Sequence, residues 1–97
     1  MKTRDEIIRI LSAERPRLSR EYRLNRLALF GSRARGDAVA GSDVDILVDV
    51  DPAIGLRFVS LADELESLLG ERVDVVSRRA VNPRHWKHIE PDLIDVA

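Results

Sequence analysis

An alternation of apolar and acidic residues near the middle of the chain constrains the fold most strongly. From residue 43 to residue 50, aliphatic side chains occupy every second position, at Val44, Ile46, Val48 and Val50. The positions between them are acidic except for Leu47. A period of two is that of a β-strand, whose successive side chains point to opposite faces. We therefore predict a strand with one face in a core and a mostly acidic face directed outward.

The residues before this strand predict a helix, a short strand and a tight turn. Thr3 and Glu6 have the spacing of a capping box at a helix start. Pro16 is expected to break or kink this helix, which gives one helix to about Glu14 and another turn or two through Tyr22. An apolar run over residues 26–30 predicts a buried strand that ends in a sharp turn, followed by a brief helix over 32–35 and a loop over 36–42.

The residues after the central strand continue the alternation. Apolar residues at helical spacing predict an amphipathic helix over 58–69, which Gly70 ends. Residues 72–77 predict a third strand with Asp74 on one of its faces. A last helix is expected from Pro83 to Pro91, before a short tail. Strands that alternate with helices favour an α/β fold, and we predict one domain over residues 1–97.

Composition narrows the classes of function. The chain has no cysteine, which excludes disulfides and thiolate zinc sites. No apolar segment is long enough to span a bilayer, and the N-terminus lacks the apolar region of a secretory signal, so we expect no membrane partner and a cytoplasmic location. No aromatic-rich basic surface for RNA is evident, so direct nucleic-acid binding is not expected. The sequence gives no indication of the oligomeric state.

The formal net charge of −1 hides an uneven distribution. Residues 37–77 hold ten acidic side chains against two basic ones, whereas residues 1–36 hold ten basic against four acidic. Most of these charges are explained as solvated surface. The central carboxylates are different because several fall on one strand, where like charges repel. A bound cation is therefore expected there.

Three features together point to metal-dependent phosphoryl-type transfer. Gly31-Ser32 follows a strand, Asp43 and Asp45 open the next strand, and Asp74 lies in a third. Aspartates two residues apart on a strand point to the same side, where they could share one or two Mg²⁺ ions, and a third carboxylate could complete a two-metal site. A Gly-Ser turn that opens a helix offers N–H groups and a hydroxyl to phosphate oxygens.

Each of these residues also has an ordinary structural explanation. Gly31 fits a tight turn, and Ser32 fits a helix N-cap. Asp43 fits a turn and Asp74 an exposed strand position. The conjunction of all of them in one order and spacing is what favours the chemical interpretation.

Two segments carry a resemblance to a known family. Residues 29–36 are LFGSRARG and residues 41–48 are GSDVDILV, so that Gly-Ser is followed after ten residues by Asp-x-Asp. This pattern resembles the signature of the DNA polymerase β-type nucleotidyltransferase superfamily, in particular its minimal nucleotidyltransferases. That branch includes the MNT antitoxins of HEPN/MNT toxin–antitoxin pairs. The resemblance implies a small mixed β-sheet with flanking helices.

The resemblance also implies roles for individual residues. Asp43, Asp45 and Asp74 would be catalytic and would ligate two Mg²⁺ ions, and Asp74 could help to deprotonate the acceptor. The nucleotide ATP would be bound by Gly31, Ser32 and Arg35. For Arg33, a solvated loop charge is the expected role.

The function that follows is transfer of AMP from Mg-ATP to a hydroxyl of a partner protein. By resemblance, the partner would be a helical HEPN ribonuclease toxin, modified on a tyrosine and thereby silenced. The alternative is a non-catalytic, nucleotide-binding antitoxin that neutralises its toxin by contact. Transfer to a small molecule or to RNA is less favoured, because such enzymes usually carry a helical second domain.

The C-terminal segment departs from the expected antitoxin pattern. Residues 82–93 match poorly the last helix expected of an MNT antitoxin. His85 and His88 lie three residues apart, but with no suitably spaced carboxylate or cysteine we expect a surface helix rather than a metal pair. Trp86 is expected to anchor a core or an interface.

Overall fold

A mixed β-sheet organises the computed structural model, which describes all of residues 1–97. The strand order is β3-β2-β1-β4, with β1 antiparallel to β2 and β4, and β2 parallel to β3. The predicted α/β arrangement of a small mixed sheet with flanking helices is confirmed. The elements in chain order are α1 (Arg4–Tyr22), β1 (Leu24–Phe30), α2 (Gly31–Arg35), β2 (Val44–Val50), η1 (Pro52–Ile54), α3 (Arg57–Leu69), β3 (Val73–Ser77), η2 (Arg78–Ala80), α4 (Pro83–Ile89), η3 (Glu90–Asp92) and β4 (Ile94–Asp95).

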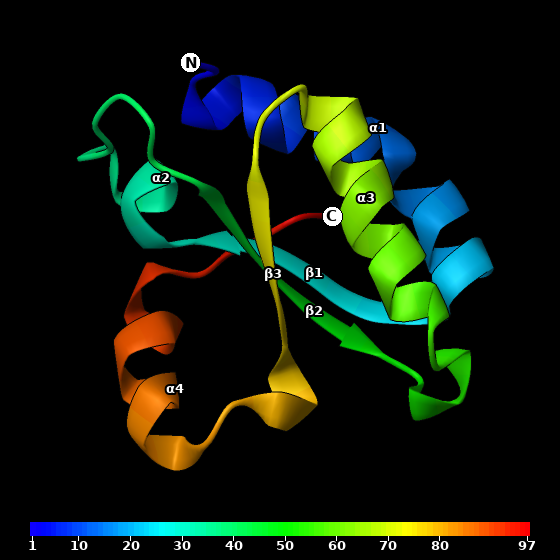
Figure 1. Ribbon diagram of the computed structural model, residues 1–97. Coiled ribbons are helices and arrows are strands. Elements are labelled where there is room, and N and C mark those ends of the chain that lie inside the picture. Colours follow the sequence, from blue (N-terminus) through cyan, green and yellow to red (C-terminus); the bar gives the residue numbers. More distant parts are fainter.

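The main core lies between one face of the sheet and the helices α1 and α3. These two helices lie together on one side of the sheet, whereas α2 and α4 lie away from them (Figure 1). Burial of aliphatic side chains is the principal stabilising term in such a layer. The core cluster includes Ile7, Leu11 and Leu18 from α1, Leu61, Leu65 and Leu69 from α3, and Leu27, Leu29, Val44, Ile46 and Val48 from the sheet.

The second face of the sheet carries the predicted site residues, and it is only partly open. Alternation on β2 places Asp45, Leu47 and Asp49 on this face, opposite the core. The predicted outward face is wrong at Leu47, which is fully buried, as is its cross-strand partner Ala28. The physical reason is that η2 packs on β2 and η3 packs on β1. The acidic residues therefore surround a small apolar patch.

The first helix differs from the prediction at Pro16. The capping box is confirmed: Thr3 Oγ1 accepts from the Glu6 N–H and Glu6 Oε1 accepts from the Thr3 N–H, both at 3.2 Å. The expected break is wrong, because α1 is one helix of 19 residues with Pro16 inside it. Pro16 is exposed, so its ring lies on the outer side while Leu11 and Leu18 are buried on either side of it. The packing of these leucines outweighs the lost backbone hydrogen bond.

The C-terminal tail forms an edge strand that the sequence did not indicate. Ile94 pairs with Leu29 in β4, and the Val96 N–H donates to the Leu27 carbonyl at 2.8 Å. Val96 is 1% exposed, and the Arg15 side chain donates to its carbonyl. The tail thus closes the β1 edge of the sheet. None of the helices combines the length and the apolar character needed to cross a membrane.

Candidate active site

The predicted carboxylates come together on the second face of the sheet. Asp45 of β2 pairs in register with Asp74 of the parallel strand β3, and with Phe30 of β1 on its other side. Register partners on neighbouring strands point to the same face, so the two carboxylates are neighbours. Asp43 precedes Asp45 by two residues and therefore shares this face. The structure thus assembles Asp43, Asp45 and Asp74 from residues up to 31 positions apart.

The pKa of Asp45 reflects its burial and the negative charges of the neighbouring carboxylates. Burial raises the pKa of Asp45, and the negative charges of Asp74 and Asp43 raise it further, while the charge of Arg35 acts in the opposite direction. A raised carboxyl pKa means that the ionised form is disfavoured in the folded protein. A cation bound between these groups would relieve the repulsion.

The backbone at Gly31 lies close to the carboxylate of Asp45. Its φ is +73°, a left-handed conformation that side chains other than glycine rarely adopt, and a Cβ at this position would lie 2.2 Å from Asp45 Oδ2. The turn from β1 into α2 therefore passes directly beside the carboxylate. Ser32 is the second residue of α2, and the N-cap position belongs to Phe30, whose side chain makes no capping bond. Helix capping is thus not the role of Ser32.

Arg33 is a buried structural residue, and the expectation of a solvated loop charge is wrong. It is 3% exposed and donates two hydrogen bonds to Glu71, to Oε1 at 2.8 Å and to Oε2 at 2.9 Å. The same guanidinium donates to the carbonyls of Lys2, at 2.8 Å, and Ser42, at 3.3 Å. Because a guanidinium has five donors in a fixed plane, it joins α2, the start of β2, the loop before β3 and the N-terminal segment.

Arg35 is exposed and holds α2 against the C-terminal segment. Its Nε donates to Asp37 Oδ2 at 2.9 Å, and its Nη1 donates to Asp92 Oδ2 at 2.8 Å. Its side chain is 46% exposed. The positive charge of Arg35 acts to lower the pKa of Asp45, although its hydrogen bonds go to Asp37 and Asp92. Its binding of nucleotide stays a prediction.

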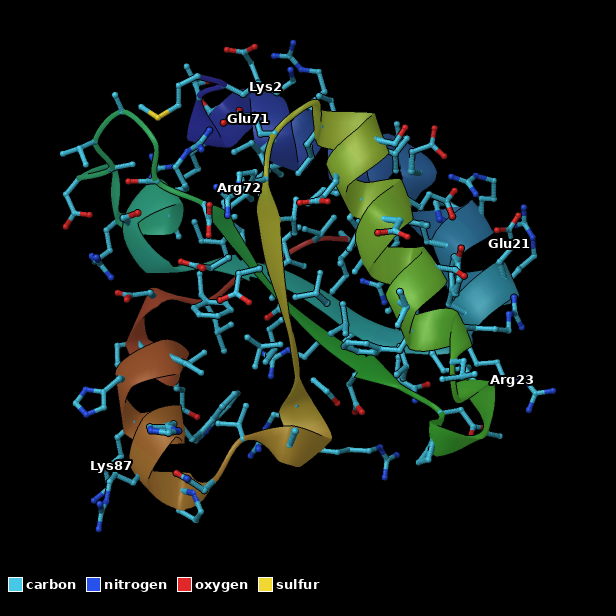
Figure 2. The ribbon with its side chains drawn as sticks, in the orientation of Figure 1. Lys2, Glu21, Arg23, Glu71, Arg72 and Lys87 are labelled. Atoms are coloured by element: carbon cyan, nitrogen blue, oxygen red, sulfur yellow. The ribbon has the colours of Figure 1, made fainter.

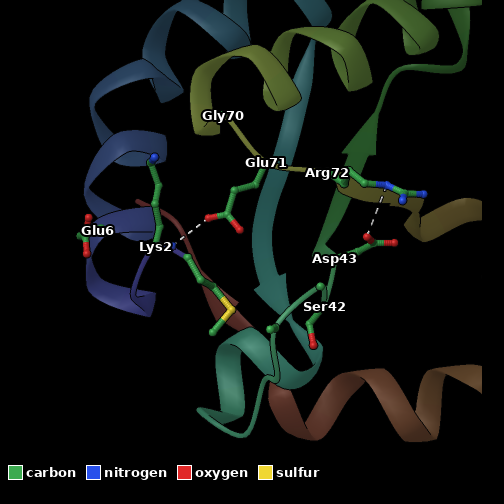
Figure 3. A pocket seen from close by; sticks show the side chains of 10 residues that line it. Lys2, Glu6, Ser42, Asp43, Gly70, Glu71 and Arg72 are labelled. Atoms are coloured by element: carbon green, nitrogen blue, oxygen red, sulfur yellow. Dashed lines mark hydrogen bonds and ion pairs between the residues drawn. The ribbon is translucent and has the colours of Figure 1, made fainter.

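The largest cavity lies beside the carboxylates rather than over them. It measures about 660 Å³ and is bounded by the N-terminal residues, the loop that enters β2 and the loop that enters β3. Of the three aspartates, only Asp43 lines it. Figure 3 shows Arg72 extended toward Asp43, and a second contact between the Lys2 backbone N–H and Glu71 Oε2 at 2.9 Å. Asp45 and Asp74, which lie on the same sheet face as Asp43, line none of the cavities.

The donor set suits magnesium without forming a finished metal cluster. No group of three carboxylates or imidazoles is close enough to hold an ion by itself. Hard carboxylate oxygens are nevertheless the ligands that Mg²⁺ takes from proteins, and it keeps several positions for water and phosphate. The adjacent Asp45 and Asp74, with the raised pKa of Asp45, fit an ion that arrives together with a nucleotide.

The C-terminal helix is an exposed element fastened by its own aromatic residue. The Arg78 guanidinium lies 3.8 Å from the centroid of the Trp86 ring, and Trp86 Nε1 donates to Glu90 Oε2 at 2.9 Å. Both contact partners of Trp86 thus belong to the segment from η2 to η3, one at each end of it. His85 and His88 are exposed on α4, which agrees with the expected surface helix.

Comparison with known sequences identifies the family of the chain. Residues 6–96 match the nucleotidyltransferase domain family, so the chain belongs to this family. The protein adenylyltransferase MntA of Thermococcus cleftensis is 42% identical over 83 residues, which is 84% of this chain and 83% of MntA. The resemblance drawn from residues 29–48 is therefore confirmed, and the chain is an enzyme of nucleotidyl transfer.

Solved structures share this fold over most of the chain. A minimal nucleotidyltransferase matches with a TM-score of 0.79 and 33% identity, over 96% of this chain and 95% of its own. A toxin–antitoxin complex with AMP-PNP matches with a TM-score of 0.71 and 26% identity, over 89% of this chain and 72% of that one. A Shewanella oneidensis complex of a tri-AMPylated HEPN toxin with its MNT antitoxin matches with a TM-score of 0.66 over 93% and 71%. At 22% identity, this last match shows the fold alone.

Proposed function

We propose that the chain transfers AMP from Mg-ATP to a hydroxyl group of a partner protein. The observation that carries this proposal is the register of Asp45 with Asp74, directly beside Gly31. This arrangement brings two carboxylates on neighbouring strands together, directly beside the turn that leads from β1 into α2. The name of MntA as a protein adenylyltransferase supports AMP as the group and a protein as the acceptor.

The residues divide into those that hold magnesium and those that hold phosphate. Asp43, Asp45 and Asp74 would hold two Mg²⁺ ions, which supply charge neutralisation at the reacting phosphate. Gly31 and Ser32 would bind the triphosphate at the start of α2, where the first N–H groups have no partner within the helix. Arg35 would add a positive charge after exchanging one of its exposed carboxylate contacts.

The transfer forms one bond and breaks one bond at the α-phosphorus. The acceptor oxygen attacks the α-phosphorus, and pyrophosphate leaves with the electron pair of the broken P–O bond. Asp74 is the exposed carboxylate of the pair and would accept the proton of the acceptor hydroxyl. Asp45 lies deeper in the sheet and would stay ionised through its contact with the cation.

The acceptor is proposed to be a tyrosine of a helical HEPN toxin, which makes this chain an antitoxin acting in the cytoplasm. The complexes formed by similarly folded chains support such a partner. The open face that carries Asp45 and Asp74 also supports it, because a protein surface can approach it directly.

A labelling experiment tests the activity. The chain is mixed with its toxin partner, ATP labelled at the α-phosphate and Mg²⁺, and label is measured on the partner. Transfer predicts label on the toxin, release of unlabelled pyrophosphate and loss of both with EDTA. A partner that stays unlabelled while it is bound and neutralised would favour the alternative, in which nucleotide binding and contact suffice.

A further inference from the structure

The exposed Arg72 stands out because it shares the sheet face of the carboxylates. We propose that Arg72 is a further substrate-binding residue, which binds the polyphosphate of the magnesium nucleotide. This inference rests on the proposed nucleotidyl transfer and deepens it. Val73 pairs with Val44, so Arg72 lies beside Asp43, and the Val44 N–H donates to the Arg72 carbonyl at 2.9 Å.

Strand periodicity gives Arg72 its orientation. Side chains two residues apart on a strand share a face, so Arg72 is on the same side as Asp74, just as Asp43 is on the same side as Asp45. Arg72 Nε lies 3.8 Å from Asp43 Oδ1, and the close view shows the guanidinium extended toward this carboxylate (Figure 3). In the wider view, Arg72 lies at the start of β3, next to Glu71 (Figure 2).

The ion pair with Asp43 is weak and easily exchanged. The Arg72 side chain is 88% exposed and that of Asp43 is 44% exposed, and this pair is the only ion pair of Arg72. Exposed pairs at such distances contribute little to stability because water screens them. Arg72 also borders the cavity of about 660 Å³, so its guanidinium has room to move.

The other arginines near the site are less available. Arg33 is buried and fully engaged with Glu71 and two carbonyls. Arg35 is held between Asp37 and Asp92. Arg72 is thus the arginine on this face with the fewest contacts to give up.

When Asp43 binds magnesium, Arg72 loses its carboxylate partner, and the phosphate groups of the nucleotide can replace it. In the proposed function Asp43 is a magnesium ligand, and the nucleotide brings phosphate oxygens to the same face. Arg72 then exchanges the carboxylate of Asp43 for a phosphate oxygen. A guanidinium suits this exchange because its planar donors match phosphate geometry.

Calorimetric titration with Mg-AMP-PNP tests the proposal without requiring turnover. We expect Arg72→Gln to weaken binding by about tenfold or more, since it removes a charge-assisted hydrogen bond. Mg²⁺ or Mn²⁺ alone should bind the variant as well as wild type or better, because Asp43 is released from its ion pair. Arg72→Lys should retain part of the nucleotide affinity. Arg20→Gln, on the exposed surface of α1, makes the same charge change away from the site.

The outcomes separate this inference from the proposed function. Weakened nucleotide binding in Arg72→Gln, with Arg20→Gln like wild type, supports the inference. Equal nucleotide binding by Arg72→Gln and wild type overturns the inference on Arg72 and leaves the proposed function intact. Equal weakening of nucleotide binding in Arg72→Gln and Arg20→Gln has the same consequence. Unchanged binding with reduced labelling of the partner would assign Arg72 to the acceptor and also overturn it. Failure of wild type itself to bind Mg-AMP-PNP would overturn the proposed function as well.

Discussion

Gly31 and Asp45 lie so close together that a single methyl group could not fit between them. A Cβ on Gly31 would lie 2.2 Å from Oδ2 and 3.1 Å from Cγ of Asp45. The glycine of the motif is therefore tied to the second aspartate of the motif by direct contact, although 14 positions separate them. This contact brings two residues of the proposed site together.

The first prediction follows from this contact. Gly31→Ala should lower the free energy of unfolding by about 1–3 kcal/mol, because the left-handed φ of +73° is strained for alanine. It should also displace the Asp45 carboxylate and abolish labelling of the partner. Gly36→Ala is a matched control for strain, since its φ is +87° and no atom lies within 4 Å of the new Cβ. Gly31→Ala with full labelling would contradict the importance of the close approach.

The second prediction concerns the repulsion among the carboxylates. The pKa of Asp45 is raised by burial and then by the negative charges of Asp74 and Asp43. When the pH is above this raised pKa, Asp45 is ionised and lowers the free energy of unfolding. Without metal, Asp45→Asn should therefore be as stable as wild type or more stable at pH 7. The difference in free energy of unfolding between the variant and wild type should vanish as the pH falls below the ordinary aspartate pKa, because Asp45 is then protonated in both the folded and the unfolded wild type. Urea unfolding in EDTA measures it, and a clear loss of stability at pH 7 would point to a structural role.

The third prediction concerns the buried ion pair of Arg33 and Glu71. The hydrogen bonds from Arg33, and then that from the Lys2 N–H, lower the pKa of Glu71 from 4.5 to about 2. A lowered pKa gives stability that is present above 4.5 and is lost as the pH falls toward 2. Glu71→Gln should thus cost about 3 kcal/mol at pH 7 and about half of that at pH 3.

Urea unfolding at the two pH values measures this effect. Asp63→Asn, an exposed position on α3, controls for the loss of one charge. A Glu71→Gln deficit that is the same at both pH values would show that the ion pair is not its source.

The fourth prediction concerns the proline inside α1. Pro16 lacks the N–H that would bond to the Ser12 carbonyl, so Pro16→Ala should restore this bond. We expect the free energy of unfolding to rise by about 1–3 kcal/mol, after allowing for the more flexible unfolded chain. Thermal unfolding measures the change. A less stable variant would mean that the proline fits a local bend that alanine does not reproduce.

The sequence was sufficient for those features that depend on neighbouring residues. The period of two around Asp45 predicted β2, and Thr3 with Glu6 predicted the start of α1. The carboxylates of Asp43 and Asp45 were expected on one face for the same reason. These inferences need only local geometry, which the order of residues determines.

Features that depend on distant partners could not be predicted in this way. The pairing of Asp45 with Asp74 requires the parallel register of β2 and β3. Arg33 was expected to be solvated because its partner Glu71 lies 38 positions away. The strand β4 has two residues, too few for a recognisable period. In each case tertiary packing, rather than local preference, determines the outcome.

The central claim is that catalysis at the paired aspartates neutralises the partner, and one variant tests it directly. Asp45→Asn removes one proposed metal-ligating charge and leaves a remote docking surface unchanged. The measurement is growth of cells that express the toxin together with wild type, Asp45→Asn or the surface control Asp63→Asn, with binding checked by co-purification. We predict that Asp45→Asn binds the toxin but neither labels nor neutralises it, while Asp63→Asn does all three. Full neutralisation by Asp45→Asn would show that contact alone is sufficient and would contradict the account.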